Sequence, residues 1–88
     1  MQKIIRPKTN CDWIDATNNG MHLVLSGEVE GVAQDLIRVV ADESDESLWV
    51  QICVKEAIVQ VPFQTIKKMV ESSLDGVHSE SWFERNNK

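Results

Sequence analysis

Four side chains in this sequence could serve as soft metal ligands or as a nucleophile with its base: Cys11, His22, Cys53 and His78. Neighbours in this set are at least eleven residues apart, and no CxxC or HxxxH spacing occurs. Structural zinc sites usually draw on closely spaced ligand pairs, and an activated cysteine needs a nearby base that a third group orients. The pattern therefore predicts no metal site and no catalytic residues, and a Cys–His enzyme is the weakest alternative.

The glycine-rich motifs of phosphate and dinucleotide binding are also missing. The chain contains no P-loop, no GxGxxG and no GxSxG sequence, and its four glycines have the spacing of turn residues. We therefore expect neither a cofactor nor enzymatic activity.

The acidic residues are the most informative chemical feature. The net charge is −5 and the isoelectric point about 4.9, which argues against direct binding to nucleic acid or to an anionic membrane. Residues 9–54 carry nine acidic side chains and one basic one, Arg38, for a local charge of −8. The rest of the chain has five acidic and eight basic residues. A surface of one sign steers a basic partner and speeds its association.

This asymmetry predicts a small non-enzymatic binding protein that inhibits or masks a basic protein, such as a nuclease or another nucleic-acid-handling protein. Bacteriocin immunity proteins and phage-encoded nuclease inhibitors work in this way, and the analogy concerns size and charge alone. The expected partner-binding residues are Glu28, Glu30, Asp42, Glu43, Asp45, Glu46 and Trp49. Trp49 would be the aromatic anchor of that surface.

Three other interpretations of the same residues stay open. The acidic loops could simply keep the protein soluble. The chain could be a homo-oligomeric structural or accessory module, for example a homodimer that pairs through the sheet face around Trp49. Residues 42–46 could hold calcium, but they lack the alternating ligands and the glycine of an EF-hand loop.

A small fold must position these residues. The 88 residues predict one domain, residues 1–88, and the hydrophobic fraction of 42% is typical of a globular chain. Alternation and turn residues predict strands at 2–6, 21–26, 48–54 and 57–61. Residues 11–16 are either the hairpin partner of 21–26, which we favour, or one helical turn. Asn19-Gly20 has the preferred composition of a type I′ hairpin turn.

Residues 27–41 are ambiguous, because their apolar residues fit both a helix and a strand. The β-branched run Ile37-Arg38-Val39-Val40 favours a strand at 36–41, followed by a polar hairpin tip at 42–46.

The C-terminal part of the chain predicts a helix at about 63–75, after Pro62 and before Gly76. Its apolar stripe consists of Phe63, Ile66, Val70, Leu74 and Val77. Residues 78–88 have no clear period, and Trp82 with Phe83 either packs under the helix or forms a docking element. The predicted fold class is therefore α+β: a two-layer domain in which a mostly antiparallel sheet of four to five strands is packed by a C-terminal helix.

The basic segment at residues 1–8 has an apolar stretch of only two residues, so we expect no signal peptide, and no run approaches about 20 apolar residues. We therefore expect a cytoplasmic protein that does not contact membranes. Cys11 and Cys53 are expected to be reduced, with Cys53 a small core or strand residue.

Overall fold

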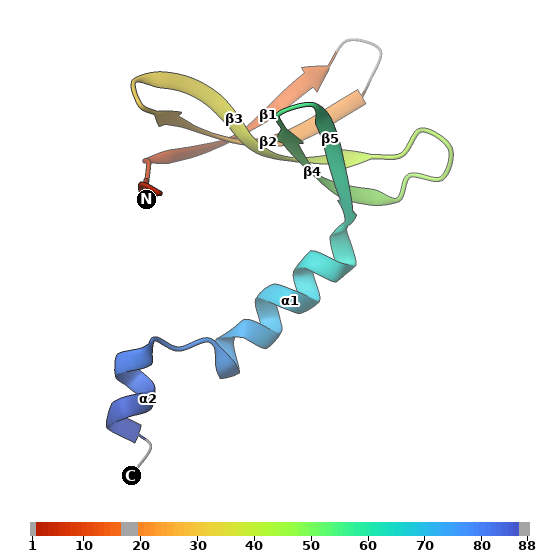
Figure 1. Ribbon diagram of the computed structural model, residues 1–88. Coiled ribbons are helices and arrows are strands. Elements are labelled where there is room, and N and C mark those ends of the chain that lie inside the picture. Colours follow the sequence, from red (N-terminus) through yellow and green to blue (C-terminus); the bar gives the residue numbers. More distant parts are fainter. Residues whose placement is uncertain (1, 17–19, 87–88) are drawn as a thin grey trace.

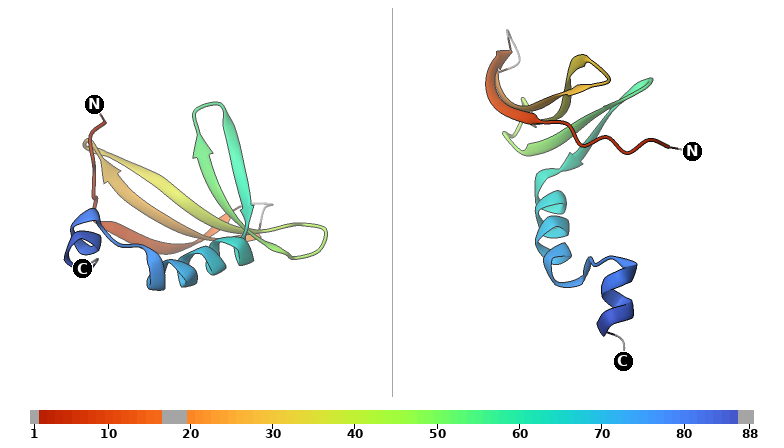
Figure 2. Two further views of the ribbon diagram at one scale, coloured as in Figure 1. Left: turned by 60° about the horizontal axis from the view of Figure 1, so that its bottom comes forward. Right: turned by 90° about the vertical axis from the view of Figure 1, so that its left-hand side faces the viewer.

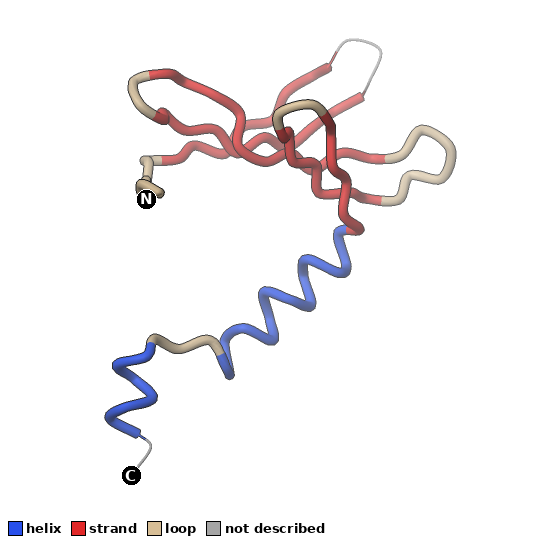
Figure 3. Tube along the Cα trace, in the orientation of Figure 1, coloured by secondary structure: helices blue, strands red, loops and turns tan. Residues whose placement is uncertain are grey.

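A computed structural model of the chain describes residues 2–16 and 20–86. The strands are β1 (Thr9–Ala16), β2 (Gly20–Val29), β3 (Val32–Ala41), β4 (Leu48–Val54) and β5 (Ala57–Pro62), and the helices are α1 (Phe63–Gly76) and α2 (Glu80–Asn86). The strands form one antiparallel sheet in chain order, and both helices follow it (Figures 1 and 3). The predicted α+β class, with a mostly antiparallel sheet of four to five strands and a C-terminal helix, is confirmed, and the sheet has five strands.

Residues 27–41 resolve into strand, turn and strand. β2 continues to Val29, and β3 begins at Val32, four residues before the predicted strand at 36–41. The connecting residues Glu30 and Gly31 have φ angles of 52° and 81°. Two successive positive φ angles are the geometry of a tight hairpin turn whose twist suits the strands on either side. Asn19 of the predicted Asn19-Gly20 turn lies outside the described residues, so the turn type is not tested, but the strands on both sides of it pair as expected.

The predicted strand at residues 2–6 is wrong, because these residues form no ladder and pairing with β2 begins only at Thr9, opposite Gly27. Pro7 has no backbone N–H to donate to a ladder. The chain instead passes close to Gly27, where an added Cβ would lie 3.1 Å from the Lys8 carbonyl oxygen and 3.4 Å from the Pro7 Cβ.

The register of the sheet separates apolar from polar side chains. One row of directly opposed residues crosses all five strands and is wholly apolar: Trp13, Leu23, Val39, Val50 and Val61. The next row is Asp12, Val24, Arg38, Gln51 and Gln60. Directly opposed residues share a face and successive residues alternate between faces. We call the side with the first row the apolar face and the other side the polar face.

The buried core is small. Among the described residues, only Val24, at 1% exposure, and Val40 and Val50, both at 7%, are buried. Val24 and Val40 belong to the polar face and Val50 to the apolar face, so neither side of the sheet is covered by a complete second layer.

Helix α1 starts directly after β5 and contacts β4 and β5 near this junction. Phe63 and Ile66 are half-buried, but the later apolar residues Val70, Leu74 and Val77 are exposed. The helix leads away from the sheet, and the molecule measures 57 × 35 × 24 Å (Figures 1 and 2). The predicted stripe therefore exists, but most of it covers nothing in its own chain.

The tail, for which the sequence predicted no element, forms the short helix α2. The Ser79 side chain accepts a hydrogen bond from the Trp82 backbone N–H at 3.2 Å, as an N-cap does. The Trp82 ring stacks on His78 with centroids 3.7 Å apart, which leaves Trp82 half-buried and Phe83 exposed. Neither aromatic residue packs under α1 to form a core.

Candidate functional site

The acidic loop, residues 42–46, joins β3 to β4 and is held in shape by its own hydrogen bonds. The backbone N–H of Glu46 donates to the Asp42 carbonyl oxygen at 2.9 Å, and that of Asp42 donates to Ser47 at 2.8 Å. The Asp42 carboxylate accepts the backbone N–H and the hydroxyl of Ser44, and Asp45 accepts the same two groups of Ser47. Short Asx turns of this kind fix a polar loop without any core.

The hydrogen bonds from Ser44 favour the ionised form of Asp42. The side-chain hydrogen bond from Ser44, followed by the Ser44 backbone N–H, lowers the pKa of Asp42 below its ordinary value of 3.8. Asp42, Glu43, Asp45 and Glu46 are all exposed, so the tip carries four carboxylates that face water.

Trp49 supports the loop and is not an exposed anchor. Its side chain is half-buried, and its indole N–H donates to the Ser47 hydroxyl at 2.9 Å. Ser47 therefore connects Trp49 to Asp45. Of the two tryptophans in the sheet, Trp13 is the exposed one, at 72%, on the apolar face. Trp13 is not among the predicted site residues, although its alternation with Asp12 in the predicted strand was the available signal.

The structure separates Glu28 and Glu30 from the other predicted site residues. They lie at the β2–β3 turn, whereas the acidic loop closes the opposite end of β3 (Figure 1). Ten residues of strand put about 33 Å between these ends. Glu30 also pairs with Lys3, at 3.4 Å. Consecutive connections of an antiparallel sheet alternate between its ends, so Glu28 and Glu30 lie apart from the acidic loop. The predicted site residues that the structure brings together are Asp42, Glu43, Asp45, Glu46 and Trp49.

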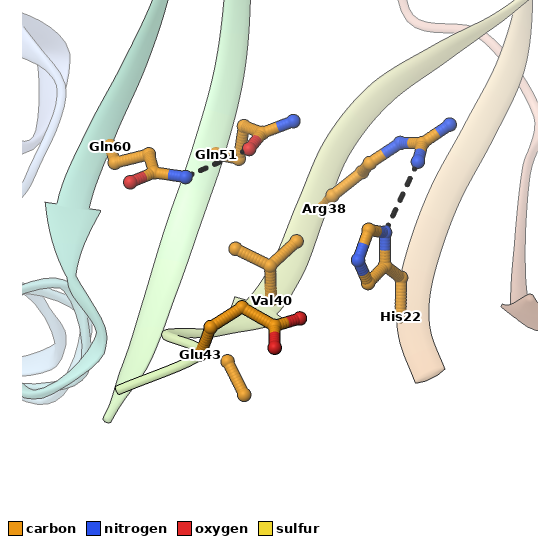
Figure 4. A pocket seen from close by; sticks show the side chains of 7 residues that line it. His22, Arg38, Val40, Glu43, Gln51 and Gln60 are labelled. Atoms are coloured by element: carbon orange, nitrogen blue, oxygen red, sulfur yellow. Dashed lines mark hydrogen bonds between the residues drawn. The ribbon is translucent and has the colours of Figure 1, made fainter. Parts of the chain in front are cut away.

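A polar hollow of about 350 Å³ adjoins the acidic loop on the polar face (Figure 4). It is lined by His22, Arg38, Val40, Ala41, Glu43, Gln51 and Gln60. Gln60 donates to Gln51 at 2.9 Å, so β4 and β5 each present an amide side chain there. Sequence reasoning missed the hollow, because its residues come from four strands and a loop.

Arg38, the one basic residue of the acidic half, is already engaged in this hollow. Its guanidinium pairs with Asp35 at 2.5 Å and lies 3.2 Å from the His22 ring nitrogen Nδ1. The positive charge of Arg38 is therefore offset by Asp35, and it does not neutralise the acidic loop. The polar side chains of the hollow offer hydrogen-bond donors and acceptors.

The remaining candidate ligands are dispersed. Cys11 and Cys53 are free and exposed, in β1 and β4. Within residues 2–16 and 20–86, no three His, Cys, Asp or Glu side chains gather where they could hold a metal ion. The described helices are all too short or too polar to cross a membrane.

Comparisons with protein-family models, curated proteins and solved structures gave no match to this chain.

Proposed function

We propose that this protein is a small non-enzymatic binding protein of the cytoplasm that masks or inhibits a basic protein, with the acidic loop as its main contact. The observation that carries the proposal is the loop itself: four exposed carboxylates on a tip whose shape is held by Ser44, Ser47 and Trp49. A preorganised loop loses little conformational freedom when it binds.

The chemistry of this tip suits a partner surface rich in arginine and lysine. Surfaces of that kind are built to hold phosphates, which is why a nuclease or another nucleic-acid-handling protein is the proposed target. The polar hollow next to the loop adds the Gln51 and Gln60 amides, which can donate and accept hydrogen bonds at the edge of the contact.

The test uses two double variants that remove the same charge from opposite ends of β3. Glu43→Gln with Glu46→Gln neutralises two side chains of the loop that make no hydrogen bond in the described structure, and the bond from the Glu46 backbone N–H to Asp42 is kept. Glu28→Gln with Glu30→Gln neutralises the distant turn. A partner would first be isolated by affinity capture with stepwise salt elution, and association rates would then be measured with the purified proteins at low salt.

We expect the loop variant to associate about threefold to tenfold more slowly, with a smaller effect from the turn variant. Equal effects of the two variants would mean that the association rate depends on the net charge of the protein and not on the position of the acidic loop. An unchanged rate for the loop variant would rule the acidic loop out as the binding site.

A second candidate function is a homo-oligomeric accessory module. The observation that favours it is the exposed apolar face, which carries Trp13 and lies on the side of the sheet opposite to Trp49.

A further inference from the structure

The apolar face of the sheet has a shallow hollow that none of the residues described by the structure fills. The hollow measures about 260 Å³ and is lined by Trp13, Met21, Leu23, Val39, Val40, Ala41, Leu48 and Phe63. Trp13, Met21 and Leu48 are exposed there. Large apolar patches of this kind usually mark an interaction surface.

Helix α1 presents a second uncovered apolar surface. Along its length, Met69, Val70 and Leu74 are exposed, with Leu74 at 79%, and no described residue of the helix is buried. A helix with a continuous apolar stripe gains most of its stability from packing that stripe against another element.

The chain cannot bring these two surfaces together by itself. Pro62 is the last residue of β5, where it pairs with Trp49, and Phe63 is the first residue of α1. With no linker between strand and helix, the direction of α1 is set by the end of β5, and it points away from the sheet (Figure 2).

The total surface shows how much burial is missing. The accessible surface of the chain is 7782 Å², whereas a folded monomer of 10.0 kDa exposes about 5,200 Å². The radius of gyration is 16.7 Å, against about 12 Å for a compact chain of this length. The excess of about 2,500 Å² per chain is what an extensive, obligate dimer interface removes from water.

We infer that the protein forms a homodimer in which α1 of each copy lies across the apolar face of the other. This exchange is a symmetric, self-complementary arrangement that uses both uncovered surfaces twice. The charges agree with it, since Lys67 and Lys68 are the charged residues of the first half of α1 and the sheet that would receive it is acidic. The inference rests on the second candidate function and holds whether or not the acidic loop binds a basic partner.

The experiment measures molar mass by light scattering during size-exclusion chromatography. The wild-type chain should elute at about 20 kDa, twice the 10.0 kDa of one copy. Leu74→Glu places a charge in the stripe and should yield a monomer, whereas the matched control Ser72→Glu, on the opposite side of α1, should leave the dimer intact. Trp13→Glu, on the receiving face, should also yield a monomer.

Mixing distinguishes helix exchange from other dimers. A pair made of one Leu74→Glu chain and one Trp13→Glu chain retains one intact helix–sheet contact, so the two monomeric variants should form a heterodimer together. If Trp13→Glu disrupts the dimer and Leu74→Glu does not, the two copies pair sheet face to sheet face. If Leu74→Glu disrupts the dimer and Trp13→Glu does not, they pair helix to helix. Either result, or a wild-type monomer, would overturn the inference.

The dependence on salt concentration distinguishes the dimer from binding of a basic partner, which is the proposed function. The apolar dimer should persist at high salt, where binding of a basic partner through the acidic loop weakens. Glu43→Gln with Glu46→Gln should leave the dimer unchanged.

Discussion

At the scale of single residues, two serines decide the character of the acidic loop. Ser44 donates two hydrogen bonds to Asp42, and Ser47 donates two to Asp45 while it accepts one from Trp49. The carboxylates in this loop are therefore part of its structure as well as its charge. Protonation of Asp42 removes an acceptor from the turn, so the loop and its charge depend on pH together.

The first prediction concerns Ser44→Ala, which removes the largest cause of the lowered Asp42 pKa. The pKa of Asp42 should rise toward 3.8, as followed by NMR titration of the carboxyl carbon. Because the folded pKa is depressed, the interaction stabilises the fold above pH 3.8 and is lost as the pH falls through the folded value. The control is Ser47→Ala, because the Ser47 hydroxyl bonds to Asp45 and its removal should leave the pKa of Asp42 unchanged. An equal shift of the Asp42 pKa in both variants would contradict this assignment.

At the scale of elements, the tight turn between β2 and β3 determines how the acidic residues are distributed. Because Glu30 and Gly31 reverse the chain there, Glu28 and Glu30 end up at the far end of β3 from the acidic loop. A helix over the same residues, which the apolar spacing also allowed, would not have formed the hairpin that brings His22 beside Arg38.

The second prediction tests this turn with two glycines that have the same open space for a Cβ but different backbone conformations. No atom lies within 4 Å of a Cβ added at Gly31 or at Gly76, but Gly31 has a φ of 81°. Gly31→Ala should therefore reduce the free energy of unfolding by about 1–2 kcal/mol through backbone strain alone. Gly76→Ala should leave it unchanged or raise it by about 0.5 kcal/mol. Urea denaturation of both variants measures the difference, and similar effects at the two sites would argue against a strained turn.

At the scale of the whole molecule, a single chain buries few of its apolar side chains. Three valines form the buried core among the described residues, and the apolar face of the sheet and the apolar stripe of α1 lie apart in one chain. The polar face carries the proposed binding chemistry, and the apolar face carries the proposed self-association. One small sheet can therefore present the acidic loop while it completes its core with a second copy.

The third prediction follows from this division. If folding and association are coupled, the midpoint of thermal unfolding should rise with protein concentration, because dilution favours dissociation. Leu74→Glu should lower the midpoint and abolish its dependence on concentration. A wild-type midpoint that is the same at all concentrations would show that the monomer is stable without a partner.

The sequence by itself determined those elements of this protein whose signals are local and clear, whereas the strand predicted at 2–6 does not form and α2 was not predicted. The alternation of apolar and polar residues defined β4. The helix α1 was bounded by Pro62 and Gly76, and the loop at 42–46 was marked by its Asp and Ser residues. Tertiary structure decided the rest. The pairing of the strands separated Glu28 and Glu30 from the loop, and it left Trp49 half-buried and Trp13 exposed. The direct β5–α1 junction carried the apolar stripe of the helix away from the sheet. These outcomes depend on contacts between residues far apart in the chain, which no short stretch of sequence encodes.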